Sequence, residues 1–241
     1  MFRQGDDEIV FKQEERTEMD IQITEASTLS GQNSPHGVKK ILHIDSSVMG
    51  AGSASRQLTA RILDRMREKY PQAHVLHRDL TAEPLPYMTF ASLPGAHPLS
   101  AKYDLLSGQE QKIRHQSDAI VDEFIACDTL VLGAPMYNFG IAAQLKSWLD
   151  RIVIPNKTFR YGPDGQVGLA GSKRVIAVIT RGSLYGPASS LWNMEHAETY
   201  LRAVLSFLGI SNPEMIVAEG IALDRKSTLS AAMNAVEQLV C

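Results

Sequence analysis

The chain of 241 residues has only two cysteines, Cys127 and Cys241. So few cysteines argue against a disulfide framework and against a cysteine metal site, and a reducing, cytoplasmic setting is the expectation. No apolar run approaches the ~18 residues of a membrane span, and the first residues lack the apolar core of a signal peptide. We therefore expect no membrane span. A formal net charge of −3 provides no basic excess, so we also expect no nucleic-acid partner.

A metal-ligand set is also missing, although the chain has seven histidines. His43 falls in a predicted strand, and His74 and His77 lie in or beside another at a spacing that metal ligands do not use. We interpret the histidines as structural or surface residues and expect no metal site. His196, before a predicted helix, is kept only as a secondary candidate for contact with a substrate.

Two parts of the chain differ in composition. Residues 1–37 are rich in polar and charged side chains and show no sustained apolar period, which predicts a poorly ordered N-terminal extension. Residues 38–241 alternate short apolar runs with helical patterns, which is typical of one α/β domain. No function is assigned to the extension.

The apolar runs predict five strands, each followed by a helix. The strands are expected at residues 40–45, 73–79, 129–134, 174–180 and 215–219. This alternation predicts a doubly wound, five-stranded parallel sheet with helices on both faces, in the flavodoxin-like order 2-1-3-4-5. Residues 81–106 form a long loop with four prolines, and residues 157–165 form a turn-rich excursion.

The loop after the first strand is rich in serine and glycine. Ser47, Ser53 and Ser55 precede a predicted helix, where hydroxyls, backbone N–H groups and the positive helix end suit a phosphate monoester. The simpler interpretation is that Ser53 only caps the helix. The segment 50–55 matches a GxGxxG dinucleotide fingerprint poorly, because Ser55 replaces the last glycine. No Walker lysine is present, so phosphoryl transfer is disfavoured as well.

Two further loops are expected at the same sheet edge. Residues 135–140 leave the third strand with two aromatic rings and an amide, which can cover and hydrogen-bond a planar heterocycle. Residues 180–183 follow the fourth strand and contain Gly182, which permits close backbone approach. A phosphate-bearing planar ligand, FMN, would satisfy all three loops.

Several motifs carry a resemblance to a known family. They are Ile44–Ser47, Ser53–Ser55, Ala134–Phe139, Gln144–Lys146, Thr158–Tyr161, Gly168-Leu169 and Glu219–Ala222. Over residues 38–240 the sequence resembles the FMN-dependent NADH:quinone oxidoreductases and azoreductases. The resemblance implies a phosphate site at Ser47, Ser53, Ala54 and Ser55, a ring and ribityl site at Met136, Tyr137, Asn138 and Phe139, and a polar ring edge at Thr180, Arg181, Gly182 and Ser183.

The resemblance also implies an activity. FMN would accept a hydride at N5 from NADH or NADPH and pass two electrons to a quinone, or to an azo compound as an additional activity, in a ping-pong cycle. We expect backbone N–H groups and Arg181 to stabilise charge on the reduced ring, and we name no catalytic side chain. The family is dimeric, with a substrate pocket completed by the partner subunit. The alternative is a flavodoxin-like FMN electron carrier without NADH turnover.

Two positions depart from the family pattern. Ser183 stands where a second glycine is more usual, which puts contacts at that position in question. Residues 184–192 also differ from the family in length and composition, so the preferred substrate is open.

Overall fold

A computed structural model describes residues 38–239. The predicted N-terminal extension, residues 1–37, lies outside the described residues, as do residues 240 and 241. The interpretation of that extension therefore stays a prediction, and all structural statements below concern residues 38–239.

Five parallel strands form the central sheet, in the order β2-β1-β3-β7-β8. Their bounds are β1 (Lys40–Asp45), β2 (His74–Asp79), β3 (Thr129–Tyr137), β7 (Arg174–Thr180) and β8 (Glu214–Ala218). Counted along the chain, this is the predicted order 2-1-3-4-5, so the flavodoxin-like fold class is confirmed. The buried strands read as continuous apolar runs because both of their faces are covered.

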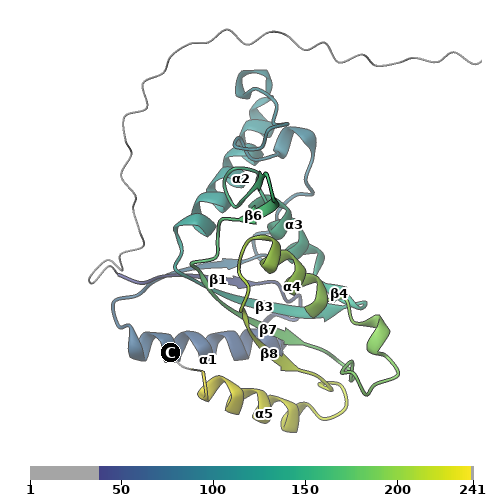
Figure 1. Cartoon of the computed structure of the whole chain (residues 1–241). Coiled ribbons are helices and arrows are strands. Elements are labelled where there is room, and N and C mark those ends of the chain that lie inside the picture. Colours follow the sequence, from purple (N-terminus) through teal and green to yellow (C-terminus); the bar gives the residue numbers. More distant parts are fainter. Residues whose placement is uncertain (1–37, 240–241) are drawn as a thin grey trace, which may run out of the picture. The chain divides into compact units, whose positions relative to one another are not determined.

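Helices cover both faces of the sheet (Figure 1). On one face lie α1 (Ala54–Lys69) and α5 (Arg225–Glu237), whose apolar residues share a core with Ile41, Val131 and Ile176. On the other face lie α2 (Gly108–Ala126), α3 (Ala143–Ile152) and α4 (Glu198–Phe207), packed over Leu42 and Leu132. The two cores use alternate residues of the same strands, as the two-residue period of a strand requires.

The start of α1 follows from its cap. The Ser53 hydroxyl accepts a hydrogen bond from the Arg56 amide at 3.3 Å, which is the N-cap arrangement anticipated from the sequence. The buried residues Leu58, Ile62 and Met66 then recur at helical spacing, so one face of α1 is apolar and packs on the sheet.

The third strand is longer than predicted. It does not break at Pro135 but continues through Tyr137, and it turns back as β4 (Gly140–Ile141). Met136 pairs with Ile141 and Tyr137 with Gly140, so the expected loop is a hairpin with only two residues, Asn138 and Phe139, at its tip. The last two residues of β3 extend beyond its pairing with β7, and they pair with β4 instead.

The predicted turn-rich excursion is also a hairpin, made of β5 (Phe159–Gly162) and β6 (Gly165–Gly168). The helix that the sequence predicts over residues 194–208, the fourth of five, starts later than expected, at Glu198. The reason is the buried Glu195, whose carboxylate accepts hydrogen bonds from the amides of Ala197, Glu198 and Thr199. This carboxylate caps α4, and residues 192–194 form a separate 3₁₀ turn.

Two buried arginines hold the long loop over residues 81–106. Arg114 donates to the carbonyls of Ala91 and Ala101, and Arg151 donates to the carbonyl of Pro86 at 2.6 Å. Both guanidiniums are enclosed, so their charge is compensated by carbonyl oxygens and hydroxyls, not by water.

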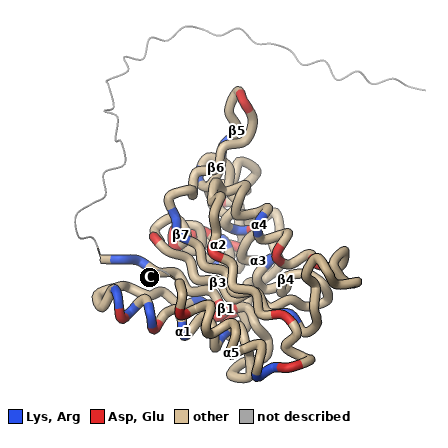
Figure 2. The backbone as a smooth tube through the Cα atoms, turned by 60° about the horizontal axis from the view of Figure 1, so that its bottom comes forward, with Lys and Arg blue, Asp and Glu red and all other residues tan. Residues whose placement is uncertain are grey.

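The surface charges are mixed. Basic and acidic positions alternate along α1, where Arg61, Arg65 and Arg67 are interleaved with Asp64 and Glu68 (Figure 2). Within residues 38–239, no helix combines the length and apolarity that a membrane crossing requires.

Candidate functional site

A hollow of about 250 Å³ opens at the carboxyl ends of β1, β3 and β7. Ligands of open α/β sheets bind at this edge. Four segments contribute to it: Ser47, Met49, Gly52, Ser53 and Ala54 after β1; Pro135, Met136 and Tyr137 at the end of β3; Thr180, Arg181 and Gly182 at and after the end of β7; Ile221, Ala222 and Arg225 after β8.

The structure brings most of the predicted site residues together here. The predicted residues that line the hollow are Ser47, Ser53, Ala54, Met136, Tyr137, Thr180, Arg181 and Gly182. Ser55, Asn138, Phe139 and Ser183 do not line it. Sequence reasoning missed the contribution after β8. The signal was present, because the loop after a fifth parallel strand must emerge at the same edge as the others.

One end of the hollow is the start of α1. Ser53 and Ser55 have their hydroxyl oxygens 3.0 Å apart, and both residues are buried. Among residues 38–239, no acceptor is found for the amide N–H groups of Ala54 and Ser55, the first two residues of the helix. Free amides, hydroxyls and the positive helix end together have the chemistry that suits a phosphate group.

The loop after β1 is joined to the end of β3. The Tyr137 phenol oxygen lies 3.1 Å from the Ser47 hydroxyl and accepts a hydrogen bond from the Val48 amide at 3.2 Å. Tyr137 therefore fixes the serine loop against the wall of the hollow that Met136 continues.

An ion-pair network supports the same loop from behind. Arg56 binds Asp79 with two hydrogen bonds of 2.7 Å each and donates to the Ser47 carbonyl at 3.0 Å. These bonds hold the pKa of the Asp79 carboxyl well below its usual range, and they raise the pKa of Arg56. The positive charge of Arg56 is thereby committed to Asp79 and is not free for a ligand.

The structure also brings together three residues that the sequence left apart. Parallel pairing places His43 beside His77, and both imidazoles face Asp45. Their Nε2 atoms lie 3.4 Å and 3.1 Å from the Asp45 oxygens. Burial raises the pKa of Asp45, but His43, His77 and Arg56 outweigh it and hold that pKa below its usual value.

The two imidazoles are not arranged as metal ligands. His77 forms a hydrogen bond with Asp45, whereas the buried Nε2 of His43 has no hydrogen-bond partner among the described residues. The two rings are stacked with centroids 4.4 Å apart and an angle of 16° between their planes. Their ring-nitrogen lone pairs therefore run nearly parallel and do not converge on one ion. Arg56 approaches the same carboxylate to 3.5 Å, which opposes a second cation.

The tip of the β3–β4 hairpin has an unusual backbone. Asn138 and Phe139 have φ angles of 46° and 75°, a left-handed conformation that suits asparagine but is unfavourable for phenylalanine. The Phe139 ring makes an edge contact with Tyr185. The backbone carbonyl of Phe139 accepts a hydrogen bond from the His196 amide. The strained tip thus packs on the segment that connects β7 to α4, beside the hollow.

The Arg181 guanidinium is buried among carboxylates. It lies 3.3 Å from Glu195, 2.6 Å from Glu198 and 3.3 Å from Glu219. The sequence led us to expect that Arg181 would stabilise charge on a reduced ring. Three carboxylates more than compensate its one positive charge, so the side chain is not a free cation for that role. Its role at the site is to fix the segment after β7, because Glu219 also accepts a hydrogen bond from the Tyr185 amide.

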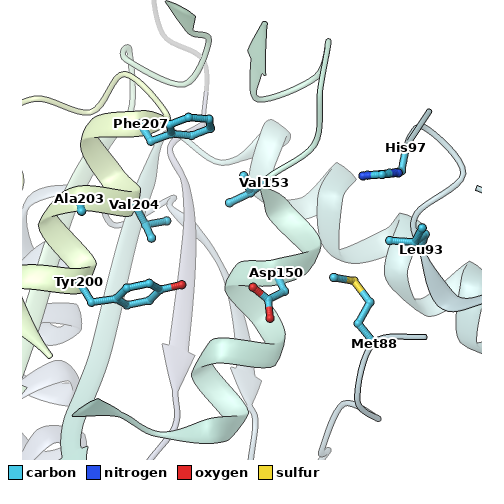
Figure 3. Close-up of a pocket in the computed structure, with 9 residues that line it drawn as sticks. All are labelled: Met88, Leu93, His97, Asp150, Val153, Tyr200, Ala203, Val204 and Phe207. Atoms are coloured by element: carbon cyan, nitrogen blue, oxygen red, sulfur yellow. The ribbon is translucent and has the colours of Figure 1, made fainter. Parts of the chain in front are cut away.

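Two further hollows lie along α3 and α4, on the face of the sheet that α2, α3 and α4 cover. One, of about 450 Å³, is lined by Met88, His97, Asp150, Val153, Tyr200 and Phe207 among others, and the Tyr200 hydroxyl points toward Asp150 (Figure 3). The other, of about 550 Å³, contains Gly140, Lys146 and His196 and shares Tyr200 and Ala203 with the first. We call these two hollows the α3/α4 face.

Comparison with known proteins agrees with this geometry. Residues 39–240 match a protein family described as having a flavodoxin-like fold. An FMN-dependent NADH:quinone oxidoreductase of Methylorubrum populi is 48% identical over 206 residues, which cover 83% of this chain and 98% of that protein. The enzyme of the same name from Methylobacterium radiotolerans is 49% identical over 203 residues, with the same coverage.

Solved structures show the same relationship at greater distance. The FMN-dependent NADH-azoreductase of Bacillus anthracis, solved in complex with FMN, superposes with a TM-score of 0.73 at 26% identity and covers 83% of this chain and 97% of that one. The azoreductase AzrA gives the same score and identity, over 82% and 96% of the two chains. The chain therefore belongs to the flavodoxin-like family of FMN-dependent NADH:quinone oxidoreductases and azoreductases.

Proposed function

We propose that the protein is an FMN-dependent NADH:quinone oxidoreductase that holds FMN in the hollow at the carboxyl edge of the sheet. The observation that carries the proposal is that groups suited to a phosphate and groups suited to a flat ring line the same hollow. Hydroxyls and free amides at the start of α1 suit a phosphate, and Tyr137, Met136 and the backbone of residues 180–182 suit a flat ring beside it. The names of the close relatives support this assignment.

FMN supplies reversible two-electron chemistry when it is bound. The protein's part is to bind and orient it. Ser47, Ser53 and the amides of Ala54 and Ser55 would take the phosphate, and Tyr137 would keep the serine loop in place. The backbone N–H groups of Gly182 and Ser183 would face the polar edge of the ring, because the Arg181 amide already donates to the Ala218 carbonyl at 2.8 Å.

The reaction partners are assigned by family. NADH is the proposed electron donor and a quinone the proposed acceptor, as in the names of the curated relatives. Reduction of azo compounds is proposed as an additional activity, because it is supported by the names of the more distant structural neighbours. Use of NADPH stays a prediction that kinetics must test.

A homodimer is part of the same proposal, and we place its interface at the α3/α4 face. That face carries two adjacent hollows lined mainly by apolar groups, and its second hollow includes Gly140 and Ile141 next to the strained hairpin. A partner seated there would reach the segment that borders the flavin site. Ala203→Glu places a charge between the two hollows and should yield a monomer by sedimentation, whereas Lys69→Glu on α1 should not.

The function is tested by a visible spectrum of the purified protein, followed by anaerobic addition of NADH. Oxidised-flavin bands that bleach with NADH and return with menadione are the expected result. Flavin that stays oxidised with both NADH and NADPH would indicate the electron-carrier alternative. A colourless protein that takes up no added FMN would overturn the proposal.

A further inference from the structure

We propose that Arg225, the first residue of α5, is a phosphate-binding residue that forms an ion pair with the 5′-phosphate of FMN. This inference rests on the proposed function and names a residue that the predicted site did not include. It is carried by the position of the side chain, by its lack of a carboxylate partner, and by the charges of its neighbours.

The position of Arg225 is set by a contact between distant parts of the chain. Its guanidinium donates to the carbonyl of Gly52 at 2.6 Å, across 173 positions of sequence. Gly52 directly precedes Ser53, the N-cap of α1, and both line the hollow together with Arg225. The guanidinium therefore reaches the rim of the hollow at its phosphate end.

The side chain keeps unused hydrogen-bonding capacity. A guanidinium has five N–H donors, and the bond to Gly52 uses one of them. Within residues 38–239 no carboxylate forms an ion pair with Arg225. The neighbouring Asp224 is occupied elsewhere, because its carboxylate accepts the amide of Ser227 at 3.0 Å as the N-cap of α5.

The other cations near the hollow are already neutralised. Arg181 faces three carboxylates, and Arg56 is bound by Asp79 through two hydrogen bonds. A phosphate monoester carries up to two negative charges, and hydroxyls with helix amides compensate only part of them. Among the described residues that line the hollow, Arg225 is the one cation that has no carboxylate partner, so its charge can serve a charge-assisted bond to a phosphate.

A purely structural role for Arg225 makes a different prediction. If the guanidinium only fixes Gly52, its loss should disturb the whole flavin site, with or without a phosphate on the ligand. If it binds the phosphate, its loss should affect FMN and spare riboflavin, which has the same ring and ribityl chain without the phosphate.

The test compares both flavins on the full chain stripped of bound flavin, by quenching of flavin fluorescence. For Arg225→Ala we expect the Kd for FMN to rise about 10-fold, as for a charge-assisted hydrogen bond, and its salt dependence to weaken. The Kd for riboflavin should stay within a factor of two. Arg225→Lys should restore part of the FMN affinity. Lys226→Ala, which removes the adjacent positive charge outside the hollow, should bind both flavins like the wild type.

Three outcomes would overturn the inference. An equal loss for FMN and riboflavin would make Arg225 a structural support of Gly52, and an unchanged Kd for both would remove its role. An unchanged FMN affinity with a raised KM for NADH would assign the guanidinium to a phosphate of the dinucleotide. A wild-type chain that binds neither flavin would instead refute the proposed function itself.

Discussion

The phenol oxygen of Tyr137 lies 3.1 Å from the hydroxyl oxygen of Ser47, although 90 positions separate the two residues in the sequence. This contact ties the loop after β1 to the end of β3. The proposed phosphate end and ring end of the hollow are therefore not independent, because a shift of the serine loop must break a bond to the wall that we propose contacts the ring. Such coupling preorganises a site before its ligand arrives.

Removal of that phenol oxygen should weaken flavin binding. Tyr137→Phe loses the contacts to Ser47 and to the Val48 amide, which costs about 1 kcal/mol of stability for a partly buried bond. We expect FMN affinity to fall several-fold, measured by fluorescence titration. Tyr161→Phe, on the exposed β5, serves as the control. Equal FMN affinity in both variants would contradict the role of Tyr137.

The strained residue Phe139 should be retained for function and not for stability. Phe139→Gly relieves a left-handed conformation that costs phenylalanine about 1–2 kcal/mol, and it loses one edge contact to Tyr185 of similar or smaller worth. Urea unfolding should therefore show equal or higher stability, while kcat/KM for a quinone should fall. Asn138→Gly is the matched control. A large loss of stability in Phe139→Gly would show that the ring holds the fold.

The sequence specified the sheet because its strands are short apolar runs between clear helix signals. The strand over Arg174–Thr180 was predicted with its observed bounds, and the order of strands followed from the alternation of elements. Ser53 was recognised as a cap because capping is a local interaction. Local and periodic features of this kind can be inferred without coordinates.

What the sequence could not show depends on contacts between distant residues. The extension of β3 through Tyr137 needs β4 as a partner, and the commitment of Arg181 needs Glu195 and Glu219. Likewise, Arg225 is a plain surface residue until α5 is placed beside Gly52. Propensity and spacing carry no signal for such pairs, because only the tertiary fold decides which carboxylate meets which cation.

Acid should destabilise the protein partly through Asp79. Because its pKa is depressed in the folded state, its contribution is present above the unfolded pKa of about 3.9 and is lost as the pH falls below it. The free energy of unfolding of the wild type should therefore fall more steeply between pH 5 and pH 3 than that of Asp79→Asn, measured by urea titration at each pH. Asp64→Asn removes an exposed carboxylate outside this network and is the control. Parallel curves for wild type and Asp79→Asn would contradict the assignment.

The hairpin of β5 and β6 depends on one glycine. A Cβ added at Gly168 would lie 2.0 Å from the backbone nitrogen of Gly209, which ends α4 with a φ of 90°. The clash is with backbone and not with a flexible side chain, so it can be relieved only if one of the two segments moves. Gly168→Ala should therefore cost about 3 kcal/mol or more of stability. Gly162→Ala, whose Cβ would meet its nearest atom at an ordinary 3.7 Å, should cost less than about 1 kcal/mol. Similar melting temperatures for the two variants would show that the hairpin adjusts freely.

Substitution of Arg181 tests whether its guanidinium stabilises the fold or acts on the bound flavin. Arg181→Met leaves Glu195, Glu198 and Glu219 facing one another without their shared guanidinium, and loss of one partner from a buried ion-pair cluster costs about 3–5 kcal/mol. Arg202→Met removes only an exposed partner of Glu198 and should cost less than about 1 kcal/mol. If Arg181 is committed to its carboxylates, the variant should lose stability in urea while the reduction potential of its remaining flavin stays close to that of the wild type. A stable variant with a strongly lowered potential would show instead that the guanidinium acts on the reduced ring, because a charge that stabilises the reduced state raises the potential and its removal must lower it.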